Sequence, residues 1–204
     1  SAFAGCGGGG DGDDPGEFLL VAIHPDAAAQ PTERGRRLVA LHAVGDLLYA
    51  GYGDYSANTG PIRLTPFDTV QGIFLPSEWI SDTEAIYGFR RIGDELWTPA
   101  IDPKVAADVA VRRVDGTWAD RDVVPATHLF DVNQVGNDLF MVGSVGLNAV
   151  VWRSTDGGGT FQSSLTRPPA SGIANDFARF YFAGAFAGKL YVQVADYLGG
   201  AHAT

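Results

Sequence analysis

The feature that most constrains the fold is a short phrase that recurs along the chain: a glycine, one to three further residues, then leucine and an aromatic residue. It occurs at Leu48-Tyr49, Leu96-Trp97, Leu139-Phe140 and Leu190-Tyr191. The aromatic positions follow one another at intervals of about 43 to 51 residues, the length expected when each repeat is one supersecondary unit. Most of the 204-residue chain is therefore predicted to repeat a single structural unit.

Each phrase lies between two runs rich in β-branched and aromatic residues, which predicts a hairpin. The strands expected in the second and third units are 86–92, 95–101, 109–114 and 117–120, and then 128–135, 138–144, 149–153 and 160–164. Helical solenoids share this period, but glycines interrupt any amphipathic helix of useful length. Four antiparallel strands in each unit predict an all-β fold, a β-propeller of four-stranded antiparallel blades.

The repeat predicts about three and a half blades. They span about residues 36–80, 84–122 and 127–166, with an incomplete blade at 177–204. In the first blade, residues 61–64 are expected to form the third strand and 70–75 the fourth. Propellers close with about four to eight blades, so we expect the chain to be a fragment of a longer protein. In an alternative arrangement, residues 18–23 complete the last blade and close a small ring.

The first sixteen residues differ from the rest. Phe3-Ala4-Gly5-Cys6 resembles the lipobox of bacterial lipoproteins, in which small residues precede a cysteine that becomes lipidated. The glycine-rich and acidic residues 7–16 have the composition of a flexible tether. We therefore expect residues 1–16 to be a signal-peptide remnant with its tether and residues 17–204 to form the propeller domain. The resemblance implies lipidation of Cys6, a membrane as partner, and a bacterial cell-envelope or surface location, or otherwise secretion.

Residues 154–161 match the pattern of an Asp box, with phenylalanine at the position usually held by tryptophan. The matching residues are Ser154, Asp156, Gly158, Thr160 and Phe161. Aspartate accepts hydrogen bonds from its own loop, and glycine allows positive φ. The pattern resembles that of the Asp-box (BNR-repeat) β-propellers of the sialidase-like superfamily. The resemblance implies a structural box, remote from any active centre, and residues 115–118 look like a shortened copy.

Sialidase-type catalysis, as the resemblance implies it, needs three arginines, a tyrosine and glutamate pair, and an acidic residue. Candidate catalytic residues here are Glu84, Tyr87 and Arg90, which are close in the sequence. The segment 89–92 is similar to the arginine signature of sialidases, but an extra arginine breaks its order and its proline is missing. A binding or scaffold module for a glycan or an envelope protein is therefore the favoured function, and a sialidase-like glycoside hydrolase is the alternative.

The loops after the second strands are the candidate binding surfaces. Asp54, Tyr55 and Asn58 combine a carboxylate, an aromatic face and an amide, which suits sugars or peptide segments, and Asp102 lies in the corresponding loop of the next unit. A net charge of −10 and a pI near 4.6 disfavour nucleic acid as a partner. Neither a cofactor motif nor a set of residues at metal-ligand spacing is present, so we expect no cofactor and no metal.

Overall fold

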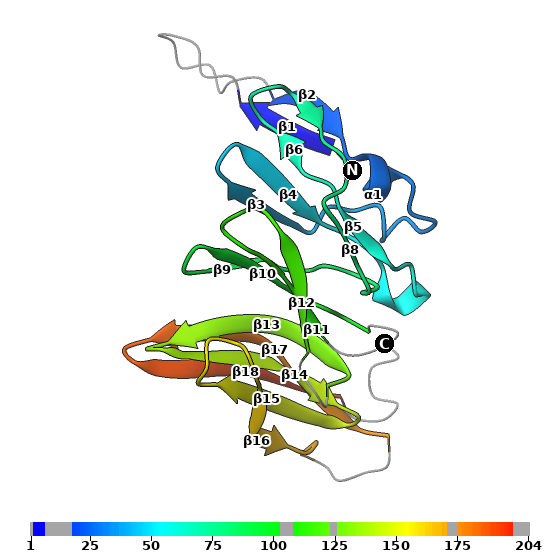
Figure 1. Ribbon diagram of the computed structural model, residues 1–204. Coiled ribbons are helices and arrows are strands. Elements are labelled where there is room, and N and C mark those ends of the chain that lie inside the picture. The colour runs from blue at the N-terminus through cyan, green and yellow to red at the C-terminus, as the bar shows by residue number, and fades with distance from the viewer. Residues whose placement is uncertain (1, 7–17, 103–107, 123–125, 171–174, 198–204) are drawn as a thin grey trace, which may run out of the picture.

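The computed structural model describes residues 2–6, 18–102, 108–122, 126–170 and 175–197. These residues form an all-β protein, as the repeat predicted, with two short helical turns, α1 (Pro25–Ala28) and η1 (Tyr55–Ala57). Asp54 caps η1, because its side chain accepts a hydrogen bond from the Ser56 amide. Both turns lie in the connections around the first sheet (Figure 1).

Three antiparallel sheets have four strands each, in an order that follows the chain. The first consists of β3 (Ala40–Val44), β4 (Leu47–Gly51), β6 (Phe67–Asp68) and β7 (Ile73–Phe74). The second consists of β9 (Arg90–Ile92), β10 (Glu95–Pro99), β11 (Asp108–Arg112) and β12 (Trp118–Asp122). The third consists of β13 (His128–Val135), β14 (Asp138–Val145), β15 (Asn148–Ser154) and β16 (Gln162–Arg167). The hairpin turns between the first two strands use Gly45, Gly93 and Gly136 at positive φ, as tight hairpins require.

Three sheets have two strands each. They are β1 (Ala2–Cys6) with β2 (Phe18–Ile23), β5 (Ile62–Leu64) with β8 (Trp79–Ser81), and β17 (Phe177–Phe186) with β18 (Lys189–Tyr197). Figure 1 shows the sheets stacked along the molecule, from β1 and β2 at the top to β15 and β16 at the bottom. The last hairpin packs on the third sheet through contacts of β17 with β13, β14 and β15.

Two expectations about strand order are wrong. Residues 61–64 do not form the third strand of the first sheet, because β5 pairs with β8 instead and β6 takes that place beside β4. The hydroxyl of Tyr52, the residue after β4, occupies the backbone groups of Arg63 in β5: it donates to the Arg63 carbonyl and accepts from the Arg63 amide. Residues 18–23 do not complete the last hairpin, since β2 pairs with β1 over its whole length.

Three of the four repeated leucine-aromatic pairs lie in the core between successive sheets, as expected, and the fourth pair contributes only its leucine. Adjacent residues of a strand point to opposite faces. Leu96 therefore packs with the first sheet, in the cluster that contains Tyr49 and Tyr52, whereas Trp97 packs with residues of the third sheet such as Met141. Leu139 and Phe140 follow the same rule, with leucine facing the preceding layer and the aromatic residue facing the next, and so do Leu48 and Tyr49. In the last pair, Leu190 packs toward the third sheet, but Tyr191 lies in no core cluster and is 53% exposed.

Candidate functional site

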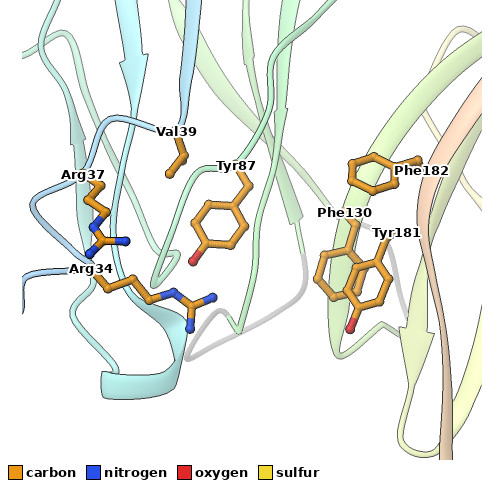
Figure 2. Close-up of a pocket in the computed structure, with 7 residues that line it drawn as sticks. All are labelled: Arg34, Arg37, Val39, Tyr87, Phe130, Tyr181 and Phe182. Carbon is orange, nitrogen blue, oxygen red and sulfur yellow. The ribbon is translucent and has the colours of Figure 1, made fainter. Parts of the chain in front are cut away.

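Two adjoining cavities open where the first strands of successive sheets face one another, and together we name them the aromatic cleft. The larger, of about 470 Å³, has Arg34, Arg37, Val39 and Tyr87 on one side and Phe130, Tyr181 and Phe182 on the other (Figure 2). The smaller, of about 290 Å³, shares Phe130 and Tyr181. Its further lining residues are Tyr55, Ile101, Asp102, His128, Phe177, Arg179 and Tyr197.

The cleft is built from one equivalent position of each repeat. Tyr87 precedes Trp97 by ten residues, and the same interval separates Val39 from Tyr49, Phe130 from Phe140, and Tyr181 from Tyr191. Two residues earlier in each repeat are Arg37, Ala85, His128 and Arg179, so three of these four positions are basic. The sequence-based predictions did not include Phe130, Tyr181, Arg37 or Arg179. The fixed interval that separates these residues from the repeated aromatic residue is the signal that identifies them.

Two of the cleft aromatics are β-bulge residues. The pairing of β13 with β14 passes from Leu129 directly to Asp131, and that of β17 with β18 passes from Phe180 to Phe182. Phe130 and Tyr181 are the extra residues, and a bulge re-aims the side chain of such a residue. Their rings lie 4.5 Å apart, so the two bulges meet in the cleft.

Asp131 stabilises both bulges. Its side chain is buried and accepts hydrogen bonds from the backbone amides of Val132 and Ala183, each at 2.9 Å. It also forms a bidentate ion pair with Arg90, at 2.7 and 2.8 Å. One carboxylate therefore joins β9, β13 and β17, and Arg90 is held by that carboxylate.

Polar groups surround the aromatic faces. The Arg34 guanidinium lies 4.9 Å from the centre of the Tyr55 ring, and Tyr55 in turn packs edge-on against Tyr87 at 5.8 Å. His128 Nδ1 lies 2.6 Å from Asp102 Oδ1. The Tyr87 hydroxyl is protonated at neutral pH, as tyrosines ordinarily are, and burial raises its pKa further, so it is able to donate a hydrogen bond.

The predicted binding residues divide into two groups. Tyr55 and Asp102 line the cleft. Asp54 and Asn58 shape the loop that carries Tyr55: Asp54 accepts from the Thr32 hydroxyl at 2.9 Å, and Asn58 adopts a left-handed conformation with φ of 50°. With its amide nitrogen assigned as the donor, Asn58 lies 2.7 Å from a Glu84 carboxylate oxygen.

The three candidate catalytic residues do not come together in the cleft. Tyr87 lines it, Arg90 pairs with Asp131, and Glu84 is buried beside Asn58. Asp102 is the one acidic residue among the described residues that line the two cavities. In the part of the chain that the structure describes, no group of three histidine, cysteine, aspartate or glutamate side chains is placed to hold a metal ion.

Residues 154–160 form a tight turn centred on Asp156. The Ser154 hydroxyl and the Thr160 amide donate to Asp156 Oδ1 at 2.7 and 2.9 Å, and the Thr160 hydroxyl donates to Oδ2 at 2.8 Å. Gly158, at φ of 88°, lies against Trp97, where a Cβ atom would approach the ring to 2.5 Å. Phe161 packs in the same core cluster as Trp97. The turn thus joins β15 to β16 and contacts the preceding sheet, away from the residues that line the cleft.

Replacing Asp156 with alanine is expected to lower the urea midpoint of unfolding at pH 7. The hydrogen bonds from Thr160 and Ser154 lower the pKa of the Asp156 carboxyl, so its stabilisation is complete above the unfolded-state pKa of about 3.9 and is lost as pH falls toward the folded-state value. The difference in urea midpoint between the wild type and the variant should therefore become smaller below about pH 4. Asp94→Ala, in an exposed ion pair, is the control. Equal midpoints at pH 7 would contradict a structural role.

Cys6 is the last residue of β1, where its Cα atom pairs with that of Phe18. The tether residues 7–16 lie outside the described residues. Among the helices described, none has the length and apolar character needed to span a bilayer.

Comparison of the sequence with protein-family models gives no match, and no curated protein matches it.

Proposed function

We propose that the chain is part of a β-propeller of the Asp-box class and acts as a non-catalytic binding module, with its ligand in the aromatic cleft. The observation that carries this proposal is that equivalent positions of four repeats converge on one cleft. Repetition of a core residue is explained by the packing that recurs in each repeat. The repeated aromatic residues of the cleft are only half-buried, and aromatic side chains at an open cleft are suited to contact a ligand.

The arrangement of the sheets supports the propeller class. Three sheets have four antiparallel strands in chain order and pack face to face. Single β-bridges connect neighbouring units at one end of their inner hairpins, from Gly53, after β4, to Ala85, before β9, and from Ile101, after β10, to His128 of β13. A third bridge, from Ala85 to Ile101, lies within the second unit and completes the row. Blades that approach one another at their inner strands produce such a row of bridges. The hydrogen bonds that Asp156 accepts within residues 154–160 support the proposal that this turn is an Asp box.

Binding is favoured over hydrolysis by the side chains available. Most glycoside hydrolases use two carboxylates, whereas Asp102 is the one acidic group among the cleft-lining residues described. A tyrosine nucleophile needs an activating base and a lowered pKa, but burial raises the pKa of Tyr87. The sialidase-like alternative is thus supported only by the position of Tyr87 in the cleft.

We also propose that Cys6 carries a lipid and attaches the protein to a bacterial membrane. The lipobox-like residues and the acidic glycine tether support this proposal. Cleavage before Cys6 would remove residues 1–5 and leave β2 without most of its partner strand. The mass of the N-terminal peptide from the native host tests it, and an unmodified Cys6 on an uncleaved chain would refute it.

The binding proposal predicts that Tyr87→Ala and Tyr181→Ala each weaken ligand binding about tenfold, because each removes an aromatic face from the cleft. The experiment is a glycan array probed with the wild type and both variants, together with capture of envelope proteins from a bacterial extract. Tyr191→Ala is the matched control, since this tyrosine is 53% exposed and does not line the cleft. The proposal would be overturned by a ligand that binds both cleft variants as tightly as the wild type. Hydrolysis of an arrayed glycan would also overturn it.

A further inference from the structure

The cleft concentrates positive charge in an acidic protein. The chain has a formal net charge of −10, yet Arg34, Arg37 and Arg179 line the two cavities with Asp102 as the one acidic residue among the described lining. Glu33 pairs with Arg37 at 2.5 Å, and Asp102 lies beside His128. The cationic character of the cleft thus comes chiefly from Arg34 and Arg179.

The guanidinium groups of Arg34 and Arg179 are positioned by contacts with neighbouring residues. Arg34 is exposed, and its Nη1 lies 3.4 Å from the Ser56 hydroxyl while its guanidinium covers the Tyr55 ring. Within the described residues, both hydrogen bonds of the Arg179 guanidinium use Nη1, to the Gly146 and Ala178 carbonyls. The planar guanidinium presents five N–H donors and matches a carboxylate with two parallel hydrogen bonds.

Each cavity combines one of these arginines with aromatic side chains. Arg34 lines the larger cavity and Arg179 the smaller, and Phe130 and Tyr181 line both. The cleft therefore offers aromatic rings together with two separate cationic groups. An extended chain of ring-shaped units, with a carboxylate on each unit, has flat faces and negative charges that suit both kinds of lining residue.

We propose that the aromatic cleft takes an internal stretch of an acidic polysaccharide, with uronate carboxylates on Arg34 and Arg179 and sugar rings on the aromatic side chains between them. This inference rests on the proposed binding function and names its ligand class. Repulsion by the acidic surface acts weakly beyond about 10 Å at moderate salt, so the local cations dominate binding.

The test measures binding of tetragalacturonate, of its carboxyl-reduced neutral tetramer and of an oligoglutamate by calorimetry, using the full chain. We expect tetragalacturonate to bind at least about tenfold more tightly than the neutral tetramer, the difference that a charge-assisted hydrogen-bond pair produces. Arg34→Gln should weaken binding of tetragalacturonate about tenfold more than binding of the neutral tetramer, and so reduce this preference. Arg91→Gln, an exposed arginine of the β9–β10 hairpin, should leave both affinities unchanged.

Each contrary outcome has a distinct meaning. Equal binding of the charged and neutral tetramers, lost in Tyr87→Ala, would overturn the acidic ligand class while leaving the binding function intact. Oligoglutamate binding as tightly as tetragalacturonate, or Arg91→Gln weakening binding as much as Arg34→Gln, would show that charge alone is recognised and would also overturn the inference. Failure of every glycan and envelope protein to bind the cleft would refute the proposed function itself.

Discussion

Replacing Trp97 with alanine is expected to lower the free energy of unfolding by about 3 to 5 kcal/mol, because it leaves a large cavity in a packed core. The Trp97 side chain is fully buried between the second and third sheets. The Arg121 guanidinium lies 5.3 Å from the ring centre, and Gly158 of the Asp156 turn packs against its edge. The variant therefore removes the packing of one side chain against two sheets and the Asp156 turn. Urea unfolding measures the resulting decrease in the free energy of unfolding.

Phe186→Ala is the matched control for Trp97. Phe186 is an aromatic residue of the last hairpin and is 74% exposed, so its removal should change stability by no more than about 0.5 kcal/mol. A loss for Trp97→Ala as small as the loss for the control would contradict the assignment of the repeated aromatic residues to the inter-sheet core.

Replacing Asp131 with alanine is expected to lower the free energy of unfolding by about 3 kcal/mol, because it removes a buried carboxylate that pairs with the half-exposed Arg90 and leaves buried amides without an acceptor. The amides are those of Val132 and Ala183, beside the two bulges. The same variant should weaken ligand binding, since Phe130 and Tyr181 depend on the bulges for their direction. Chemical unfolding and calorimetric binding at a temperature where the variant is folded measure the two effects.

Asp94→Ala is the control for Asp131. Asp94 pairs with Arg91 on the surface, where both side chains are largely exposed, and such pairs contribute about 0 to 1 kcal/mol. Asp131→Ala with wild-type stability would show that the carboxylate does not hold the bulges. Lost stability with full binding would show that the bulges do not position the ligand.

The repeated phrase allowed much of the architecture to be predicted. A leucine and an aromatic residue side by side in a strand point to opposite faces, so their recurrence specifies a sheet packed on both sides. The second and third sheets accordingly have their four strands near the predicted positions. The turn at Asp156 was also readable, since its hydrogen bonds join residues within seven positions of one another. All the residues that form such a turn lie within a short stretch of sequence, so the sequence alone predicts it.

The first sheet and the cleft depended on contacts between distant residues. Ile62 and Leu64 have the pattern of an ordinary strand, but whether they pair with β4 or with β8 is decided by the Tyr52 hydroxyl and by what is buried around them. Arg90 is similar in sequence to part of a catalytic signature, but it pairs with Asp131, which lies 41 residues later in the chain.

The sequence by itself determined the all-β class and the repeating unit that ends in a leucine and an aromatic residue. It also determined that these two side chains point to opposite faces of the sheet, because alternation along a strand is a local property. Tertiary structure alone decided which side chains meet in the cleft. Phe130 and Tyr181 enter it because a bulge adds one residue to each strand, and a bulge exists only when two strands pair with unequal numbers of residues. Pairing of that kind is a property of two segments together, and neither segment carries it alone.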